Sequence, residues 1–134
     1  MKRSGILLTL VFLVVCLAAS IDQLTAAEPS LITGSVYCDH NQNGKLDNEE
    51  KGLENIHVQI FTSYCGGTSL QTVHTNNEGN FSFKDFGPDT YFIRADLACV
   101  CGGRMPTTTT CQQVDLLPGQ TVNLPPFGYS EYGQ

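Results

Sequence analysis

Short runs of alternating apolar and polar residues, separated by turn residues, recur through most of the chain beyond residue 30. The clearest run is 55–61, NIHVQIF, in which every second residue is Ile or Val and the intervening His57 and Gln59 are polar. A period of two is typical of strands that bury one face, and no stretch of the chain shows convincing helical periodicity. Strands are therefore expected at 31–37, 55–61, 70–75, 80–83, 90–97, 112–117 and 121–124.

Turn residues separate these runs at short intervals. The segments 76–79 (NNEG), 87–89 (GPD) and 118–120 (PGQ) are rich in Gly, Pro, Asn and Asp, which favour turns. A longer segment that contains cysteines, 98–110, is expected to form a loop. Because the strands follow one another through short connections, the pattern predicts an all-β sandwich rather than alternating strands and helices.

The first twenty residues differ from the rest of the chain. Lys2 and Arg3 precede a short apolar run and then small residues, which is the arrangement of a secretory signal peptide. The apolar run is shorter than the roughly 20 residues that a membrane-spanning helix needs. We expect cleavage after Ala27, with Ser20 as the other position, and a single domain over 28–134 that ends in a short polar tail. A lipoprotein signal and an uncleaved anchor are the alternatives.

Acidic side chains dominate what remains after cleavage. The whole chain has thirteen acidic and seven basic residues, and removal of Lys2, Arg3 and Asp22 leaves twelve and five, a net charge of −7. An acidic chain without a basic run argues against nucleic acid or an anionic membrane as a partner. We expect no membrane insertion after signal cleavage, and a secreted, extracellular or cell-surface location, or the periplasm.

Residues 39–50, DHNQNGKLDNEE, fit the twelve-residue calcium-loop pattern D-x-[DN]-x-[DN]-G-x5-E. The positions that match are Asp39, Asn41, Asn43, Gly44 and Glu50. In an EF-hand an amphipathic helix enters the loop, whereas here the β-branched run 31–37 precedes it. The sequence therefore predicts a calcium loop that follows the first strand of a β-domain.

Calcium is a hard cation that binds six to eight oxygen atoms in irregular geometry. By loop position, the ligands would be the side chains of Asp39, Asn41 and Asn43, the backbone carbonyl of Lys45, Asp47 directly or through water, and both oxygens of Glu50. Leu46 is expected to turn inward as a hydrophobic pin. Since two of the ligands are Asn, we expect a dissociation constant of roughly 0.1 to 1 mM. The alternative is a solvated turn, which Asn, Asp and Gly also form.

Five cysteines remain after cleavage: Cys38, Cys65, Cys99, Cys101 and Cys111. In an exported protein they are expected to form disulfides, and the odd number leaves one thiol free, modified or available to link a dimer. Spacing suggests that Cys111 pairs with Cys99 or Cys101 and that Cys38 pairs with Cys65, although the sequence does not fix the connectivity. A soft-metal site is the alternative, with Cys99, Cys101, either Cys65 or Cys111, and a histidine.

Three segments together resemble a known family. They are 34–61 (GSVYCDHNQNGKLDNEEKGLENIHVQIF), 75–97 (TNNEGNFSFKDFGPDTYFIRADL) and 127–129 (FGY). They are similar to the calcium-binding B domain of serine–aspartate-repeat surface adhesins, whose wider relatives are collagen-adhesin B-type and transthyretin-like sandwiches. The resemblance extends over roughly 31–129.

The resemblance implies an immunoglobulin-like (prealbumin-like) β-sandwich of about seven strands, in which calcium stiffens a surface spacer. It also implies the same loop ligands as the pattern. Some collagen-adhesin relatives cross-link a Lys of the first strand to an Asn or Asp of the last. Here Asn123 lies in the last expected strand, but 31–37 contains no Lys, so we predict no such bond and expect the cysteines to brace the fold instead.

The leading functional hypothesis is a secreted, non-enzymatic, calcium-stabilised module of adhesin type whose partner is an extracellular protein or glycan. The alternative is a carbohydrate-binding module, which normally needs exposed aromatic side chains. The chain has no Trp, and its candidates are Tyr37, Tyr64, Tyr129 and Tyr132. Tyrosines among strands are more often half-buried structural residues.

Catalysis would require a cluster of reactive side chains. His40, His57 and His74 could join the thiols in such a cluster, but each has a simpler interpretation. His40 occupies a loop position that is not a ligand, and the other two are expected to face outward from strands. The chain contains no GxSxG, HExxH or phosphate-binding loop, so we expect no enzymatic activity.

Overall fold

Buried and exposed side chains alternate along the strands of the computed structural model, which describes residues 29–96 and 105–131. Nine strands and no helix occur in these residues. The strands are β1 (Leu31–Cys38), β2 (His57–Phe61), β3 (Gln71–His74), β4 (Asn80–Lys84), β5 (Asp89–Asp96), β6 (Met105–Pro106), β7 (Cys111–Leu116), β8 (Thr121–Asn123) and β9 (Phe127–Ser130). Within these two ranges, no helix is long and apolar enough to span a membrane. The expected signal peptide (1–27), Cys99, Cys101 and Tyr132 lie outside the described residues.

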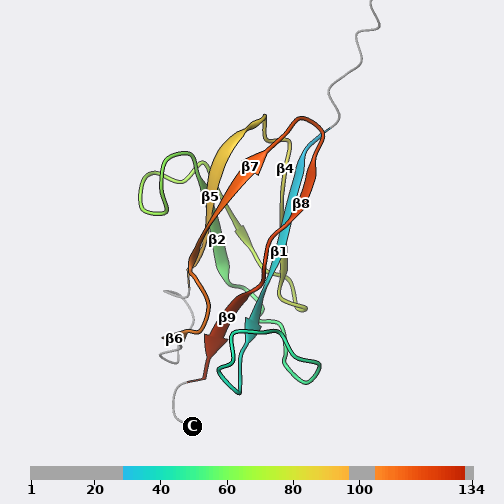
Figure 1. Cartoon of the computed structure of the whole chain (residues 1–134), viewed down its shortest axis with the longest axis vertical. Helices are drawn as coiled ribbons and strands as arrows, with labels where there is room; N and C mark the ends of the chain where they lie inside the picture. The colour runs from blue at the N-terminus through green and yellow to red at the C-terminus, as the bar shows by residue number, and fades with distance from the viewer. Residues whose placement is uncertain (1–28, 97–104, 132–134) are drawn as a thin grey trace, which may run out of the picture.

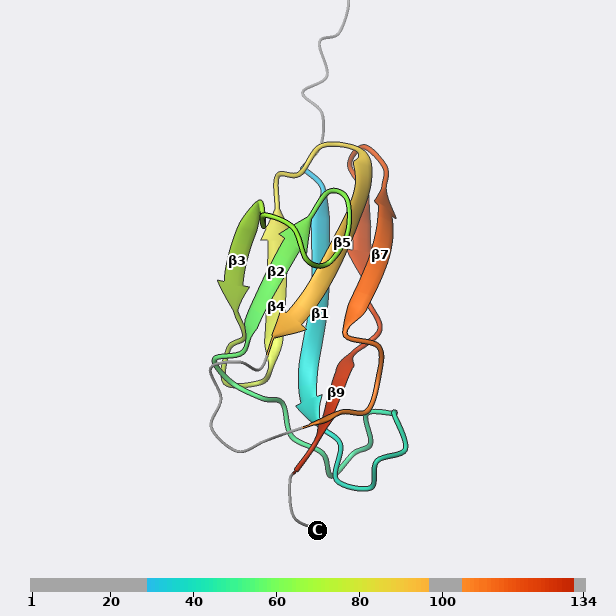
Figure 2. The same ribbon diagram turned by 90° about the vertical axis from the view of Figure 1, so that its left-hand side faces the viewer.

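The strands form two sheets that pack face to face (Figure 1). Sheet I has the order β4-β1-β9-β6, with β8 also paired to β1, and sheet II has the order β3-β2-β5-β7. Figure 2 shows sheet II toward the viewer, with β1 and β4 behind it. This two-layer arrangement confirms the predicted all-β sandwich.

The core consists of the inward-facing residues of both sheets. In sheet II, Val58, Ile60 and Ile93 are completely buried, as the alternation predicted. In sheet I, the rings of Phe81 and Phe83 meet edge to face with centroids 5.9 Å apart. Gly34 of β1 lies opposite Phe81 of β4, and an added Cβ there would overlap the Phe81 ring. The glycine that interrupts the first run therefore makes room for a core aromatic side chain.

Two short strands, β6 and β9, were not predicted. All four residues of β9 are buried, so the segment lacks the alternation that marks a half-buried strand. It pairs in parallel with the second half of β1, after β8 has paired with the first half. Asn123 therefore lies in β8 and not in the last strand. The residue opposite it in β1 is Thr33, whose Oγ1 donates to Asn123 Oδ1 at 3.1 Å.

A disulfide joins Cys65 and Cys111, with their Cα atoms 5.9 Å apart. The predicted pairs of Cys111 with Cys99 or Cys101 and of Cys38 with Cys65 are therefore wrong, as is a soft-metal site that uses Cys65 or Cys111. The reason lies in the topology of sheet II. Cys111 begins β7 opposite Arg94 of β5. The loop after β2 folds back to this position, where Arg94 Nη1 donates to the carbonyl of Cys65 at 2.8 Å.

Candidate metal centre

The 39–50 loop leaves the lower end of β1 in Figure 1 and returns to the same strand. On its return, the backbone N–H of Cys38 donates to the carbonyl of Lys51 at 2.9 Å, and Tyr37 forms an isolated bridge with Gly52. The backbone N–H of Asp39 donates to the carbonyl of Tyr129 in β9 at 2.9 Å. Both ends of the loop are thus attached to sheet I.

The loop reverses direction through two residues in the left-handed region. Gly44 has a φ of 72°, the positive value expected of the glycine in the calcium-loop pattern. Gln42, two residues earlier, has a φ of 58°, which is uncommon for a residue with a Cβ. Interactions elsewhere in the loop must therefore stabilise this turn.

Asp39, the first residue of the loop, is a carboxylate with 0% exposed surface. Its Oδ1 accepts a hydrogen bond from the backbone N–H of Asn43 at 3.1 Å, and its Oδ2 accepts one from that of Gly44 at 2.8 Å. Burial alone would raise the pKa of Asp39, but the nearby Thr107 hydroxyl and the backbone N–H groups of Gly44, Asn43 and Gln42 lower it below its ordinary value. The carboxylate is therefore ionised at neutral pH.

The two asparagines of the loop gather around Asp47. The Nδ2 groups of Asn41 and Asn43 both donate to Asp47 Oδ2 at 2.8 Å. The Oδ1 of Asn41 accepts from the backbone N–H of Asn43 at 3.1 Å, and the Oδ1 of Asn43 accepts from that of Lys45 at 2.7 Å. Three of the predicted ligand side chains are therefore in direct contact on one side of the loop.

Glu50 connects the two ends of the loop. Its Oε1 accepts a hydrogen bond from the backbone N–H of His40 at 3.0 Å, and its Oε2 accepts one from that of Asp47 at 3.0 Å. The backbone N–H of Glu50 donates in turn to the carbonyl of Asp47 at 3.1 Å. The last predicted ligand is thereby placed against both the second and the ninth residue of the loop.

Negative charge accumulates beside the buried Tyr37, which is 1% exposed. Its pKa is raised to about 12, first by burial and then by the negative charges of Asp39, Glu50 and Asp47. The hydroxyls of Tyr37 and Thr107 are buried there without a hydrogen bond of good geometry. Among the described residues, no cationic side chain forms an ion pair with the three loop carboxylates.

This donor set fits a hard cation, because every predicted side-chain ligand offers oxygen and three of them carry negative charge. The three loop carboxylates are not the most closely spaced group of potential metal ligands, however. In the described part of the chain, the His, Cys, Asp or Glu ligand atoms that lie within 4.8 Å of one another belong to Cys38, His40 and Glu131. The carboxylate oxygens of Asp39, Asp47 and Glu50 therefore do not all lie within that distance of one another.

The prediction for Leu46 is wrong. Its side chain is 48% exposed, on a loop that extends beyond the lower end of the sandwich in Figure 1. The glycan-binding alternative also loses most of its candidates. Tyr37 and Tyr129 are buried, and the Tyr129 hydroxyl donates to the carbonyl of Ala95 at 2.8 Å. Tyr64, at 61% exposed, is the one candidate tyrosine on the described surface.

Sequence reasoning missed the Cys38–His40–Glu131 cluster. In the sequence patterns, His40 takes a loop position without a ligand role and Glu131 belongs to the polar tail. The signal that could have found the cluster is the parallel pairing of β9 with β1, which brings residue 131 beside residues 38–40. That pairing was not predicted, because β9 lacks alternation.

Comparison with known proteins gives one family and several structural relatives. The family model described as the SdrD B-like domain matches residues 31–115. Among curated proteins, the chain is 34% identical over 67 residues to Colossin-A of Dictyostelium discoideum. That match covers 49% of this chain but 1% of Colossin-A, so the chain spans a very small part of the relative.

Solved structures with the same fold come from several sources. The minor pilin GBS52 of Streptococcus agalactiae superposes with a TM-score of 0.56 at 8% identity, over 81% of this chain and 47% of the pilin. The plantain pollen allergen Pla l 1 gives 0.56 at 16% identity, over 79% and 96%. The shaft pilin SpaA of Lactobacillus rhamnosus GG gives 0.52 at 12% identity, over 81% and 52%. These identities are low, so the likeness concerns the fold alone.

Proposed function

Because the chain belongs to the SdrD B-like domain family, we propose that it works outside the cell as a non-enzymatic structural and interaction module of adhesin type, stabilised by calcium in the 39–50 loop. The signal peptide predicted over 1–27 would direct it there. Its partner would be an extracellular protein or glycan, as proposed from the sequence.

The observation that carries the proposal is the arrangement of oxygen atoms in the loop. Asp39 is buried and ionised, while Asp47 and Glu50 are held in place by amide and backbone N–H groups. Hydrogen bonds from neutral N–H groups offset the negative charges only in part. A divalent cation would offset them further, and the remaining lone pairs of the same oxygens are available to bind it.

Calcium would act on the fold by fixing the lower end of sheet I. The loop is attached through Cys38 to Lys51 and through Asp39 to Tyr129 of β9. A cation held between residues 39 and 50 would therefore restrain β1, β9 and the chain that leads toward β2. In a module that bears mechanical load or displays a binding surface, this restraint would make the domain stiffer.

The test is thermal unfolding of the purified protein in calcium and in chelator. With calcium at about ten times its dissociation constant, binding to the folded state stabilises it by about 1.4 kcal/mol. For a domain of this size that corresponds to a rise of roughly 5 to 8 °C in melting temperature. The variant Glu50→Gln removes one ligand charge and should lose most of this rise.

Glu49→Gln is the matched control, since it removes the same charge from the adjacent, exposed residue that the pattern does not use. We expect this variant to keep the calcium response. Equal melting temperatures in calcium and chelator for the unmodified protein would mean that the loop is only a turn. An equal loss of the calcium-dependent rise in both variants would mean that calcium acts through the overall negative charge of the loop and not through the predicted ligands.

A further inference from the structure

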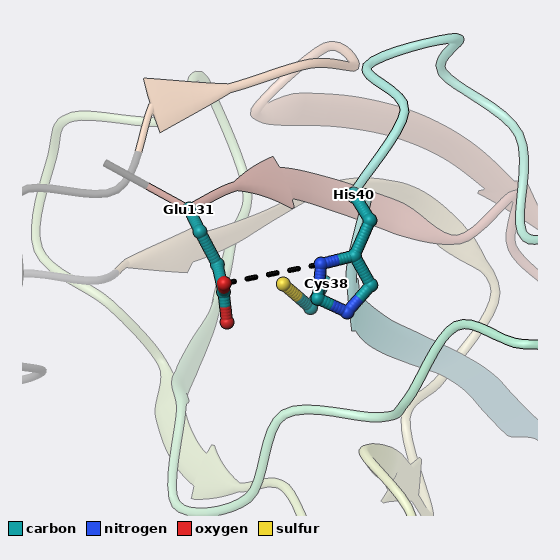
Figure 3. Close-up of side chains that lie close together, drawn as sticks. All are labelled: Cys38, His40 and Glu131. Carbon is teal, nitrogen blue, oxygen red and sulfur yellow. Dashed lines mark ion pairs between the residues drawn. The ribbon is translucent and has the colours of Figure 1, made fainter. Parts of the chain in front are cut away.

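A second group of potential metal ligands lies beside the calcium loop (Figure 3). Cys38 is the last residue of β1, His40 is the second residue of the loop, and Glu131 directly follows β9. The three ligand atoms all lie within 4.8 Å of one another, and His40 Nδ1 is 3.9 Å from Glu131 Oε2. Figure 3 shows the three side chains pointing toward a common centre.

The backbone at each position is held by the fold. Cys38 is paired in register with Tyr129 of β9, which fixes the distance between the ends of the two strands. His40 is held through its backbone N–H, which donates to Glu50 Oε1 at 3.0 Å. Glu131 follows Ser130, the last residue of β9, whose side chain bonds to the carbonyl of Met105. Strand pairing thus places Cys38 and the residue before Glu131 side by side, and a hydrogen bond to Glu50 holds the backbone of His40.

We propose that Cys38, His40 and Glu131 bind a thiolate-seeking divalent ion of the zinc type, at a site that uses none of the predicted calcium ligands although His40 belongs to the same loop. The donor types decide the class of ion. Calcium takes oxygen ligands, whereas zinc takes cysteine sulfur, histidine nitrogen and carboxylate oxygen together. The proposal does not depend on calcium binding in the loop.

The spacing also suits a tetrahedral ion. Zinc bonds of about 2.0 to 2.3 Å place neighbouring ligand atoms roughly 3.3 to 3.7 Å apart. The 3.9 Å between His40 and Glu131 is already close to that value. The side chains of these two residues are 52% and 44% exposed, so small rotations can close the remaining gap.

The three side chains differ in solvent exposure in a way that suits a metal site with access from solvent. Cys38 is 3% exposed and forms the inner wall, while His40 and Glu131 face solvent and leave a path for the ion. Three protein ligands leave a fourth position, which water or a donor from another molecule would take. The ion would also offset the negative charges of the thiolate and of the Glu131 carboxylate.

The test is titration of the purified protein with cobalt(II), without reductant and in excess calcium. Cobalt bound by a thiolate absorbs through sulfur-to-metal charge transfer, so cobalt in the calcium loop would not give this signal. We expect one equivalent of cobalt to produce the thiolate band and zinc to remove it. Cys38→Ser should abolish the band, while His40→Gln and Glu131→Gln should each weaken cobalt binding by about tenfold or more.

His74→Gln is the control, since it removes an exposed histidine of β3 outside the cluster and should leave the titration unchanged. His40→Gln and Glu131→Gln change exposed side chains, so the test remains valid if Cys38→Ser fails to fold. The proposal is overturned if no thiolate band forms, if the band survives in Cys38→Ser, or if both exposed variants bind cobalt normally. It is also overturned if peptide mapping of the unreduced protein finds Cys38 in a disulfide.

Discussion

The loops 39–50 and 62–70 both connect strands of the sandwich, but different interactions hold them in place. Loop 62–70 is tied covalently to β7 through Cys65 and Cys111, and Arg94 of β5 donates to its backbone. Loop 39–50 has no covalent bond of this kind in its described contacts. It is organised by carboxylate and amide oxygens that accept hydrogen bonds from its own N–H groups.

We expect the two loops to respond differently to the surrounding medium. A disulfide persists in any oxidising medium, so loop 62–70 should keep its structure regardless of the ions present. The oxygen-rich loop 39–50 carries uncompensated charge, so its stability should depend on the cation concentration. On the proposed function, loop 62–70 would be a fixed part of sheet II, and loop 39–50 would respond to cations at the end of sheet I.

The largest effect on stability should come from removing the disulfide that holds loop 62–70. The disulfide spans 46 residues, and in the chain-entropy model a loop of that length stabilises the fold by about 4 kcal/mol. We expect Cys65→Ala with Cys111→Ala to lower the free energy of unfolding by about that amount in urea titration. The calcium-dependent rise in melting temperature should persist in this double variant, because the two loops are distinct sites. If the double variant no longer responds to calcium, the loops form one cooperative unit.

The next effect concerns Tyr129, which links β9 of sheet I to Ala95 of sheet II near the 39–50 loop. Its pKa is raised to about 12, first by burial and then by the charge of Asp96. In the unfolded chain this pKa is about 10, so the folded protein holds the proton more tightly. The stabilisation is fully present below about pH 10 and is lost as pH rises through about 12, by an amount on the order of 3 kcal/mol at most.

We therefore predict that unfolding free energy, measured by urea titration from pH 9 to 12, falls with pH and falls less steeply in Tyr129→Phe. The matched control is Tyr64→Phe, which changes an exposed tyrosine of loop 62–70 and should leave the slope unaltered. An identical slope in Tyr129→Phe would show that this phenol does not link stability to pH. Tyr37, with a similarly raised pKa, accounts for part of the remaining slope.

The smallest of the three effects should come from Arg94. Its Nη1 donates to the carbonyl of Cys65 at 2.8 Å, its Nη2 donates to Gln59 Oε1 at 2.7 Å, and its guanidinium lies 5.3 Å from the centre of the Phe61 ring. Lysine keeps the charge but cannot reproduce this geometry. Arg94→Lys should therefore cost about 1 to 2 kcal/mol in urea unfolding without altering the calcium response. A variant as stable as the original protein would contradict this role.

Local patterns predicted the regular part of the molecule. Alternation at 55–61 placed Val58 and Ile60 in the core, and the glycine at position 44 has the positive φ that its place in the loop pattern implied. These features depend on neighbouring residues in the sequence, so a local pattern records them.

Features set by distant residues were not predicted. The disulfide depends on the register of β7 with β5, which places Cys111 next to Arg94 and hence next to Cys65. β9 is buried on both faces, so its sequence shows no period. The Cys38–His40–Glu131 cluster then follows from the pairing of β9 with β1. The spacing of these three residues along the sequence does not predict it.

The most direct test of the responsive loop is amide hydrogen exchange with and without calcium. The N–H groups of Asn43, Gly44 and Lys45 donate to oxygens of the loop, so binding of calcium by those oxygens should suppress their opening. At calcium ten times its dissociation constant, their exchange should slow by about tenfold, while Gly66 and Leu70 of the disulfide-tied loop exchange at unchanged rates. Equal exchange of the 39–50 amides in calcium and in chelator would contradict calcium binding by this loop.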